Sequence, residues 1–194
     1  MRKQDVIQFF DRMAPQWDAA LIRHDDVISK ILDGAGVTEG VRVLDVASGT
    51  GVLIPDYLER NIARVTGVDI APEMIRIAGE KFPQDNVDFL CGDVEEQPLE
   101  PVYDCVVVYN AFPHFPEPER LVRHLAGLLK PGGRLTIAHG QSRAAIDNHH
   151  KGRASKVSCG LISEHVLAAM MRKYLRLEVK ISDDRMYQVT GRKE

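Results

Sequence analysis

The part of the chain best suited to chemistry is a turn of small residues that follows an apolar run. Residues 41–45 read as a buried strand that ends on the carboxylate of Asp45, and Ala-Ser-Gly-Thr-Gly follows at 47–51. An apolar helical start comes next, and the first backbone N–H groups of a helix have no partner within it. Gly49 and Gly51 allow a ligand to approach the backbone closely. The turn therefore predicts a site for a nucleotide-like cofactor, whose identity it leaves open.

The elements that position this turn are strands and helices in alternation. Strands are expected at 41–45, 64–68, 87–91, 104–109 and 134–138, and helices at 52–60, 72–81, 118–129 and 163–174. An amphipathic segment that leads to Pro15 and a second helix over about 19–32 come before them. A hairpin over 177–182 and 186–191 follows. This order predicts an α/β fold with helices on both faces of a parallel sheet, an antiparallel final strand, and ligands at the carboxyl ends of the strands.

Composition narrows the class of protein. The chain has 194 residues, 44% hydrophobic and 27% charged, which suffices for one domain with a full core and no disulfides. A net charge of −3 argues against a nucleic-acid partner, and no apolar run is long enough for a membrane span. Three cysteines without paired spacing, and an N-terminus without a signal-peptide core, predict a cytoplasmic protein. Monomer and homodimer remain open.

Four further segments match one enzyme family in the right order. Residues 67–74 (Gly-Val-Asp-Ile-Ala-Pro-Glu-Met) resemble the acidic turn after the second strand of class I S-adenosylmethionine-dependent methyltransferases, and 91–94 (Cys-Gly-Asp-Val) resemble its adenine-binding turn. Residues 103–110 and 128–135 resemble its fourth and fifth strand regions. Residues 10–18 resemble the leader of the ubiquinone/menaquinone-biosynthesis-like (methyltransferase type 11) branch. Ordered matches of this kind are far more specific than one glycine turn.

The resemblance implies a Rossmann-like methyltransferase fold in a single domain over residues 1–194. Its sheet is expected to have seven strands, mostly parallel, with an antiparallel final strand. Within it we expect an N-terminal helical lid over 1–36 and a cofactor-binding core over 40–138. An acceptor-side loop over 139–160 and a final helix with a C-terminal hairpin over 161–194 complete the chain.

The implied cofactor is S-adenosyl-L-methionine, with S-adenosyl-L-homocysteine as product. Asp45 is expected near the methionine ammonium group, Asp69 at the ribose hydroxyls, and Asp93 at the exocyclic amine of adenine. The remaining cofactor residues are expected to be Ala47, Ser48, Gly49, Thr50, Gly51, Ile70, Met74, Gly92, Val94, Asn110 and Phe112. Ala47 stands where many relatives have glycine, and alanine fits there if its φ is negative.

Two other interpretations of these residues stay open. Asp45 and Asp93 are also suited to capping the turns beside them. A nicotinamide or flavin dinucleotide would use the same acid on the second strand, Asp69. The dinucleotide fingerprint is G-x-G-x-x-G, however, and here the glycine series ends at Gly51.

The acceptor side is indicated by the segments after the fourth and fifth expected strands. His114 lies in the first, and His139 and His150 lie in the second. Ser142 resembles a helix N-cap, which predicts a short helix over 143–150. A neutral imidazole on this side can take a proton from a hydroxyl, a thiol or an activated carbon. These three histidines are the catalytic candidates, and Trp17, His114 and Arg143 are expected on the substrate side.

The histidine-rich segment has other interpretations. His139, Asp147, His149 and His150, with Cys159, are ligand types of a zinc site, but their spacing matches no metal motif and no metal is predicted. Solvated or structural side chains are the plainer alternative. A basic cluster, Lys151, Arg153 and Lys156, is suited to attracting an anionic acceptor or to forming a solvated face.

The sequence thus predicts a methyltransferase that acts on a small-molecule acceptor by in-line methyl transfer. The alternatives are a regulatory module that binds the cofactor without turnover, and an RNA or protein methyltransferase. An acidic net charge and the absence of an appended recognition domain favour the small molecule. The atom that accepts the methyl group is left open.

Overall fold

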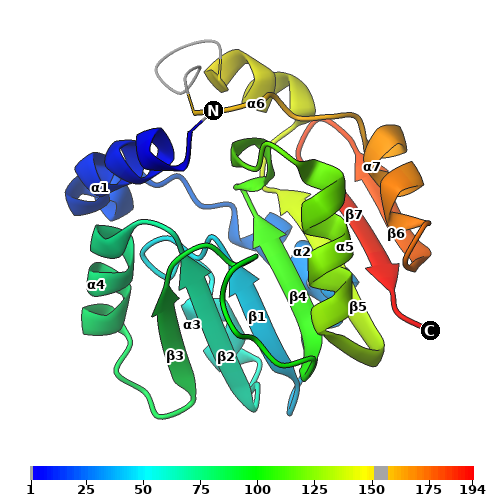
Figure 1. The fold of residues 1–194 in the computed structure, drawn as a ribbon, viewed down its shortest axis with the longest axis horizontal. Coiled ribbons are helices and arrows are strands. Elements are labelled where there is room, and N and C mark those ends of the chain that lie inside the picture. Colours follow the sequence, from blue (N-terminus) through cyan, green and yellow to red (C-terminus); the bar gives the residue numbers. More distant parts are fainter. Residues whose placement is uncertain (1, 151–156) are drawn as a thin grey trace.

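A seven-stranded sheet forms the centre of the computed structural model, which describes residues 2–150 and 157–194, with the side chains of 148–150 excepted (Figure 1). The strands run in the order β3-β2-β1-β4-β5-β7-β6. All neighbours from β3 to β5 are parallel, and β7 is antiparallel to both β5 and β6. The bounds are β1 Arg42–Val46, β2 Arg64–Asp69, β3 Val87–Cys91, β4 Tyr103–Tyr109, β5 Leu129–His139, β6 Arg176–Ser182 and β7 Tyr187–Arg192. The predicted fold class is confirmed.

Helices cover both faces of this sheet. On one face α5 and α7 pack against β1, β4, β5 and β7, and on the other α2 and α3 pack against β1, β2 and β4. Helix α4 lies beside β2 and β3, and α1 packs on α4. The bounds are α1 Lys3–Ala20, α2 Asp25–Ala35, α3 Ile54–Glu59, α4 Pro72–Lys81, α5 Pro118–Leu128, α6 Arg143–His150 and α7 Glu164–Met171, with a 3₁₀ turn η1 Phe112–His114.

The chain reverses its direction of travel across the sheet between β1 and β4. It runs from β1 outward to β3 and then crosses to β4 on the other side of β1. In open α/β sheets a crevice forms at this switch point, beyond the carboxyl ends of the strands. Figure 1 shows α1 and α6 above the arrowheads of the parallel strands, so elements from the N-terminal and C-terminal halves of the chain lie over this edge of the sheet.

The end of the first N-terminal helix and the start of the second differ from the sequence prediction. Helix α1 continues through Pro15 to Ala20, and α2 begins only at Asp25. The side chains of Phe10, Ala14 and Trp17 pack together with α4 residues, and this tertiary contact outweighs the lost hydrogen bond at the proline. Between the helices, Arg23 donates hydrogen bonds to the Val52 carbonyl at 2.6 Å and to both carboxylate oxygens of Asp56 at 2.9 Å.

Other element boundaries also differ, and the helix expected at 163–174 is α7, which ends at Met171. Helix α3 begins at Ile54 rather than at residue 52. Gly51 has a left-handed φ of 82°, and residues 51–53, which come directly before the helix, form a turn. Strand β5 begins at Leu129 rather than 134, and its pairing with β4 shifts register between Tyr103 and Cys105. The predicted helix at 143–150 is present as α6, and the Ser142 hydroxyl accepts a hydrogen bond from the Ala145 N–H at 3.2 Å, as an N-cap does.

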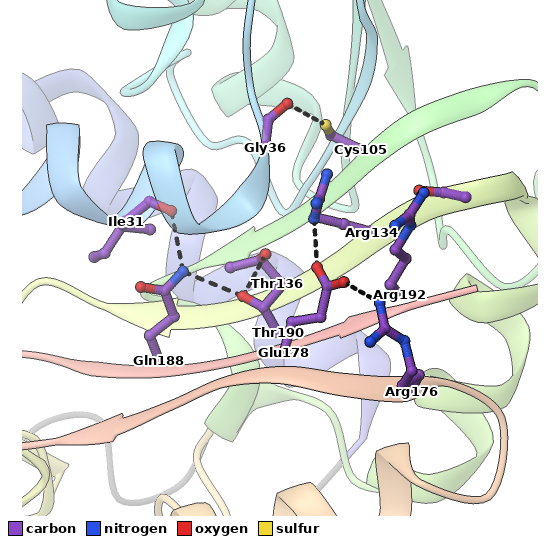
Figure 2. Close-up of polar contacts among 11 residues, drawn as sticks. Ile31, Gly36, Cys105, Arg134, Thr136, Arg176, Glu178, Gln188, Thr190 and Arg192 are labelled. Atoms are coloured by element: carbon purple, nitrogen blue, oxygen red, sulfur yellow. Dashed lines mark hydrogen bonds and ion pairs between the residues drawn. The ribbon is translucent and has the colours of Figure 1, made fainter. Parts of the chain in front are cut away.

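The C-terminal hairpin is fixed to the sheet by a polar network (Figure 2). The Gln188 side-chain amide donates to the Ile31 carbonyl of α2 at 3.0 Å and to the Thr190 hydroxyl at 3.2 Å, and Thr190 is 2.8 Å from Thr136 of β5. Nearer the surface, Glu178 of β6 accepts hydrogen bonds of 2.7 Å from Arg134 of β5 and from Arg176. These contacts join α2, β5, β7 and β6.

No helix among the described residues is both long enough and apolar enough to cross a membrane.

Candidate active site

A cavity of about 210 Å³ lies at the carboxyl ends of β1, β2 and β4. It is reached by the loops that follow these strands and by α1, which covers it. Thirteen of the predicted cofactor and acceptor residues line it: Trp17, Asp45, Ala47, Ser48, Gly49, Asp69, Ile70, Met74, Gly92, Asp93, Val94, Asn110 and His114.

Asp69, the last residue of β2, organises the turn after β1. Its Oδ2 accepts a hydrogen bond from the Gly49 N–H at 2.8 Å, and its Oδ1 accepts one from the Ala71 N–H at 2.9 Å. Burial raises the pKa of this carboxyl to about 6, although these backbone N–H groups oppose the shift. Each carboxylate oxygen has a second lone pair, so Asp69 retains capacity to accept hydrogen bonds from a ligand.

Asp45 is the second buried acid of the cavity. It lies in β1, opposite Gly67 of β2, and is only 2% exposed. Burial and the nearby Asp69 raise the pKa of its carboxyl to about 8, and the Tyr57 hydroxyl opposes this shift. A cation placed in the cavity would stabilise the ionised form of both acids.

The glycine turn contains one residue whose backbone differs from expectation. Ala47 has a φ of 55°, in the left-handed region, so the condition of a negative φ, under which alanine fits this position, is not met. The turn from β1 toward α3 imposes this conformation, and alanine accepts it at a strain on the order of 1 kcal/mol. The Ser48 hydroxyl in the same turn is buried, and among the described residues it has no hydrogen-bond partner.

The two glycines of the turn have different surroundings. A Cβ on Gly49 would lie 3.9 Å from the Met74 sulfur and 4.0 Å from the Trp17 indole nitrogen, so the space above Gly49 belongs to the cavity. A Cβ on Gly51 would instead lie 2.6 Å from the Phe82 ring. Gly51 is therefore required by packing behind the turn, and only Gly49 leaves the backbone open to a ligand.

Asp93 and Val94 follow β3 and form another wall. Asp93 accepts a hydrogen bond from the Glu95 N–H at 2.9 Å and an ion pair from Lys3 of α1 at 2.5 Å. The Val94 carbonyl is 3.0 Å from Nε2 of His124, which fixes the orientation of its peptide group.

The wall after β4 combines a strained asparagine with a histidine. Asn110 has a φ of 55°, and its side-chain oxygen accepts a hydrogen bond from the Gly140 N–H at 3.0 Å. His114 lies in η1, where its Nδ1 is 2.6 Å from the Val157 carbonyl and its ring packs edge-on against Phe10 of α1. These contacts hold the imidazole between α1 and the end of β4.

Helix α1 closes the cavity with an apolar stripe at helical spacing, formed by Val6, Phe10 and Trp17. It is tied to the loops below at two further points. The Asp11 carboxylate accepts the Glu73 N–H at 2.9 Å, and Asp18 contacts the Thr50 hydroxyl and the Lys81 ammonium, both at 2.6 Å.

Several predicted site residues do not line the cavity. Thr50 is bonded to Asp18, Phe112 is buried in the core beneath α5, and the Arg143 guanidinium donates to the Leu161 carbonyl at 3.1 Å. His139, at the end of β5, is 2% exposed with its ring edge-on to Tyr187. Gly51 lies behind the turn.

Other residues singled out in the sequence lie outside the described part. The side chains of His149 and His150 and the whole of Lys151, Arg153 and Lys156 belong there. Among the residues that the structure describes, no three His, Cys, Asp or Glu side chains are grouped to hold a metal ion.

Sequence reasoning missed other lining residues. Lys3, Val6 and Phe10 come from α1, and Tyr109, Phe115 and Arg120 come from β4 and the segment after it. The stripe at positions 6, 10 and 17 was the available signal, because it has helical period and faces one side.

Comparisons of the sequence identify similar proteins. A family model described as "Methyltransferase domain" matches residues 44–137. A malonyl-[acyl-carrier protein] O-methyltransferase of Acetivibrio thermocellus is 36% identical over 70% of this chain and 49% of its own length. A demethylmenaquinone methyltransferase of Renibacterium salmoninarum is 29% identical over 71% and 59% respectively, and a ubiquinone biosynthesis O-methyltransferase of Coxiella burnetii is 30% identical over 69% and 60%. The chain thus spans about half to three-fifths of the length of these relatives.

Solved structures share the fold. A Haloferax volcanii protein, determined in complex with the Trm112 methyltransferase activator, superimposes with a TM-score of 0.82 over 94% of this chain and 96% of that one, at 21% identity. An S-adenosylmethionine-dependent methyltransferase of Aquifex aeolicus gives 0.68 over 86% and 89%, at 22% identity.

Proposed function

We infer from the methyltransferase-domain match and the named relatives that the chain is a class I S-adenosylmethionine-dependent methyltransferase, and from this premise we propose that it transfers a methyl group from S-adenosylmethionine to a small-molecule acceptor. One observation carries the proposal: the loops after β1, β2, β3 and β4 converge on one cavity that holds two buried carboxylates and is open above the backbone of Gly49. The Ser48 hydroxyl, which has no hydrogen-bond partner among the described residues, and the open space above Gly49 are available to a polar ligand.

The residues that line the cavity fit each part of this cofactor. We propose that Asp69 accepts hydrogen bonds from the ribose hydroxyls, while Asp45 and the Asn110 carbonyl face the methionine ammonium group. Ile70 and Met74 flank the adenine ring. Asp93 accepts from its exocyclic amine, the Val94 N–H donates to a ring nitrogen, and Gly92 lets the ring approach the backbone. When bound, the cofactor supplies a methyl group already activated on a sulfonium.

The acceptor side favours a small, largely apolar molecule. Phe10, Trp17, His114 and Phe115 also line the cavity, and we propose that their rings exclude water and hold a ring or chain of the acceptor in line with the donor. Of the three catalytic candidates, His114 lines the cavity, so we propose it as the residue that holds or takes the acceptor's proton.

We also propose that four segments of the chain have different roles. Residues 1–36 serve as the lid, 40–138 as the cofactor-binding core, 139–160 as the acceptor-side loop and 161–194 as the structural C-terminal unit. The ties from α1 to Glu73, Thr50 and Lys81 support the lid, because each joins it to a loop or helix beside the cofactor site. Part of the acceptor-side loop lies outside the described residues.

Calorimetric titration with S-adenosylmethionine, S-adenosylhomocysteine and NADH tests the cofactor. Binding of the adenosyl ligands alone is the expected result, and binding of NADH alone would contradict the proposal. Two of the relatives are named as O-methyltransferases, so phenols, hydroquinones and carboxylic acids are the first acceptors to assay, by release of S-adenosylhomocysteine.

The role of His114 has its own test. His114→Asn should lower turnover with little change in cofactor affinity, whereas the matched variant His165→Asn changes an exposed histidine on α7 and should leave both unchanged. Cofactor binding with no transfer to any acceptor class would instead favour a regulatory module.

A further inference from the structure

The first turn of α1 places a lysine on the carboxylate assigned to adenine recognition. The Lys3 ammonium lies 2.5 Å from Oδ2 of Asp93 and 2.5 Å from Oε1 of Glu96. The other Asp93 oxygen, Oδ1, accepts the Glu95 N–H at 2.9 Å. Both Asp93 oxygens are therefore engaged by the protein itself, one of them by a half-exposed side chain.

We propose that Lys3 is an internal competitor of the cofactor: its ammonium group and the exocyclic amine of adenine bind the same oxygen of Asp93, and Glu96 holds Lys3 when adenine displaces it. This inference rests on the proposed cofactor pose. Lys3, Asp93 and the adenine-flanking Ile70 and Met74 line the same cavity, so the contact lies within reach of the ligand.

The exposure of the two partners makes the exchange feasible. The Asp93 side chain is 11% exposed and accepts a hydrogen bond from the Glu95 N–H, whereas the Lys3 side chain is 54% exposed. Half-exposed ion pairs of this kind are weak because water and salt screen them. A hydrogen bond from adenine to a buried carboxylate can therefore replace the Lys3 contact.

Glu96 gives Lys3 a second partner outside the adenine pocket. It lies one turn of chain beyond Asp93, is 64% exposed, and is not among the residues that line the cavity. The rest of α1 remains tied at Asp11 and Asp18 when Lys3 moves. The displacement is thus a change at the first turn of the helix and requires no opening of the whole lid.

The proposal predicts effects of opposite sign for the two partners of Asp93. Lys3→Met removes the competitor and should lower the dissociation constant for S-adenosylhomocysteine by about two- to five-fold, the range expected for an exposed ion pair. Glu96→Gln removes the alternative partner, leaves Lys3 on Asp93, and should raise that constant. The double variant should match Lys3→Met alone.

Calorimetry with S-adenosylhomocysteine, which carries adenine without the sulfonium charge, is the measurement. Arg2→Met is the matched control, since Arg2 is an exposed neighbour that pairs with Asp5. Added salt should tighten binding to the native protein and have no such effect on Lys3→Met. Unchanged or weaker binding by Lys3→Met would overturn the competition while the cofactor site stands. Failure of the native protein to bind the ligand would overturn the proposed function as well.

Discussion

The backbone N–H of Gly49 donates a hydrogen bond of 2.8 Å to the carboxylate of Asp69, which lies 20 residues further along the chain. The bond joins the turn after β1 to the end of β2. The carboxylate proposed to bind ribose therefore also sets the position of the backbone proposed to face methionine. A change at Asp69 acts on both ends of the ligand.

Asp69→Ala should weaken S-adenosylhomocysteine binding by about 1–3 kcal/mol, because the ribose hydroxyls and the Gly49 and Ala71 N–H groups all lose their acceptor. Titration calorimetry measures the loss, with circular dichroism as the check on folding. Asp88→Asn, on the edge strand β3, is the control and should leave affinity unchanged. Native affinity in a folded Asp69→Ala protein would refute the cofactor pose.

The buried acids predict an unusual dependence of stability on pH. The folded-state pKa of Asp45 is about 8 and that of Asp69 about 6, both above the values near 4 of an unfolded chain. The folded state therefore keeps protons that the unfolded state releases, and this contribution to stability is complete below pH 4 and lost as pH rises to 8.

Asp45→Asn should flatten this decline, which is on the order of 1 kcal/mol per pH unit for one proton. Denaturant unfolding at pH 5 and pH 8 measures it. Asp26→Asn is the control, because Arg185 lowers the pKa of that exposed carboxyl and its effect is confined to acid. Equal slopes for the native and Asp45→Asn proteins would contradict the assignment.

The two glycines of the turn should differ on substitution by alanine. Both have a positive φ, so both variants incur strain of about 1–3 kcal/mol. Gly51→Ala also meets the Phe82 ring and should give the lower melting temperature. Gly49→Ala places its methyl group in the cavity and should lose cofactor affinity at a smaller cost in stability. Thermal unfolding and calorimetry on the pair separate packing from binding.

The single tryptophan of the chain is a built-in reporter. Trp17 lines the cavity, and its indole nitrogen lies near the space above Gly49. Its emission should therefore shift when S-adenosylhomocysteine binds, with a midpoint equal to the calorimetric one. Gly49→Ala should move that midpoint to higher ligand concentration. If the Trp17 emission did not change at saturating ligand, Trp17 would lie away from the bound cofactor.

The polar network of Gln188, Thr190 and Thr136 beneath α2 should contribute to the stability of the fold and not to cofactor binding. Gln188→Leu leaves the Ile31 carbonyl and Thr190 without its amide and should destabilise the protein by about 1 kcal/mol. Cofactor affinity should not change, because Gln188 is not among the cavity residues. Gln84→Leu, at an exposed position, controls for the substitution itself. Weaker cofactor binding by Gln188→Leu would link the hairpin to the site.

The sequence predicted what depends on local pattern. Asp45, Asp69 and Asp93 each follow or end an apolar run, so their strands place them at one edge of the sheet. The N-cap at Ser142 is likewise a local signal. All of these features come from spacing within a few residues.

Other features depend on contacts between distant segments, which no local pattern contains. Helix α1 continues through Pro15 because Trp17 packs on α4. A side chain at position 51 would contact the Phe82 ring, which favours glycine there. The φ of Ala47 follows from the path of the turn. Lys3 reaches Asp93 only because α1 crosses the sheet's edge, and neither residue carries a signal for the other.

The anchoring of Arg23 has a consequence for how fast ligands exchange. Because Arg23 fixes the segment before α2 to Val52 and Asp56, any outward swing of α1 pivots at Leu21 and Ile22, the latter 73% exposed. The sheet and α2 stay packed during such a swing. We therefore expect ligands to enter and leave on the microsecond-to-millisecond timescale of helix and hinge motion. This motion crosses a lower free-energy barrier than unfolding of the core does.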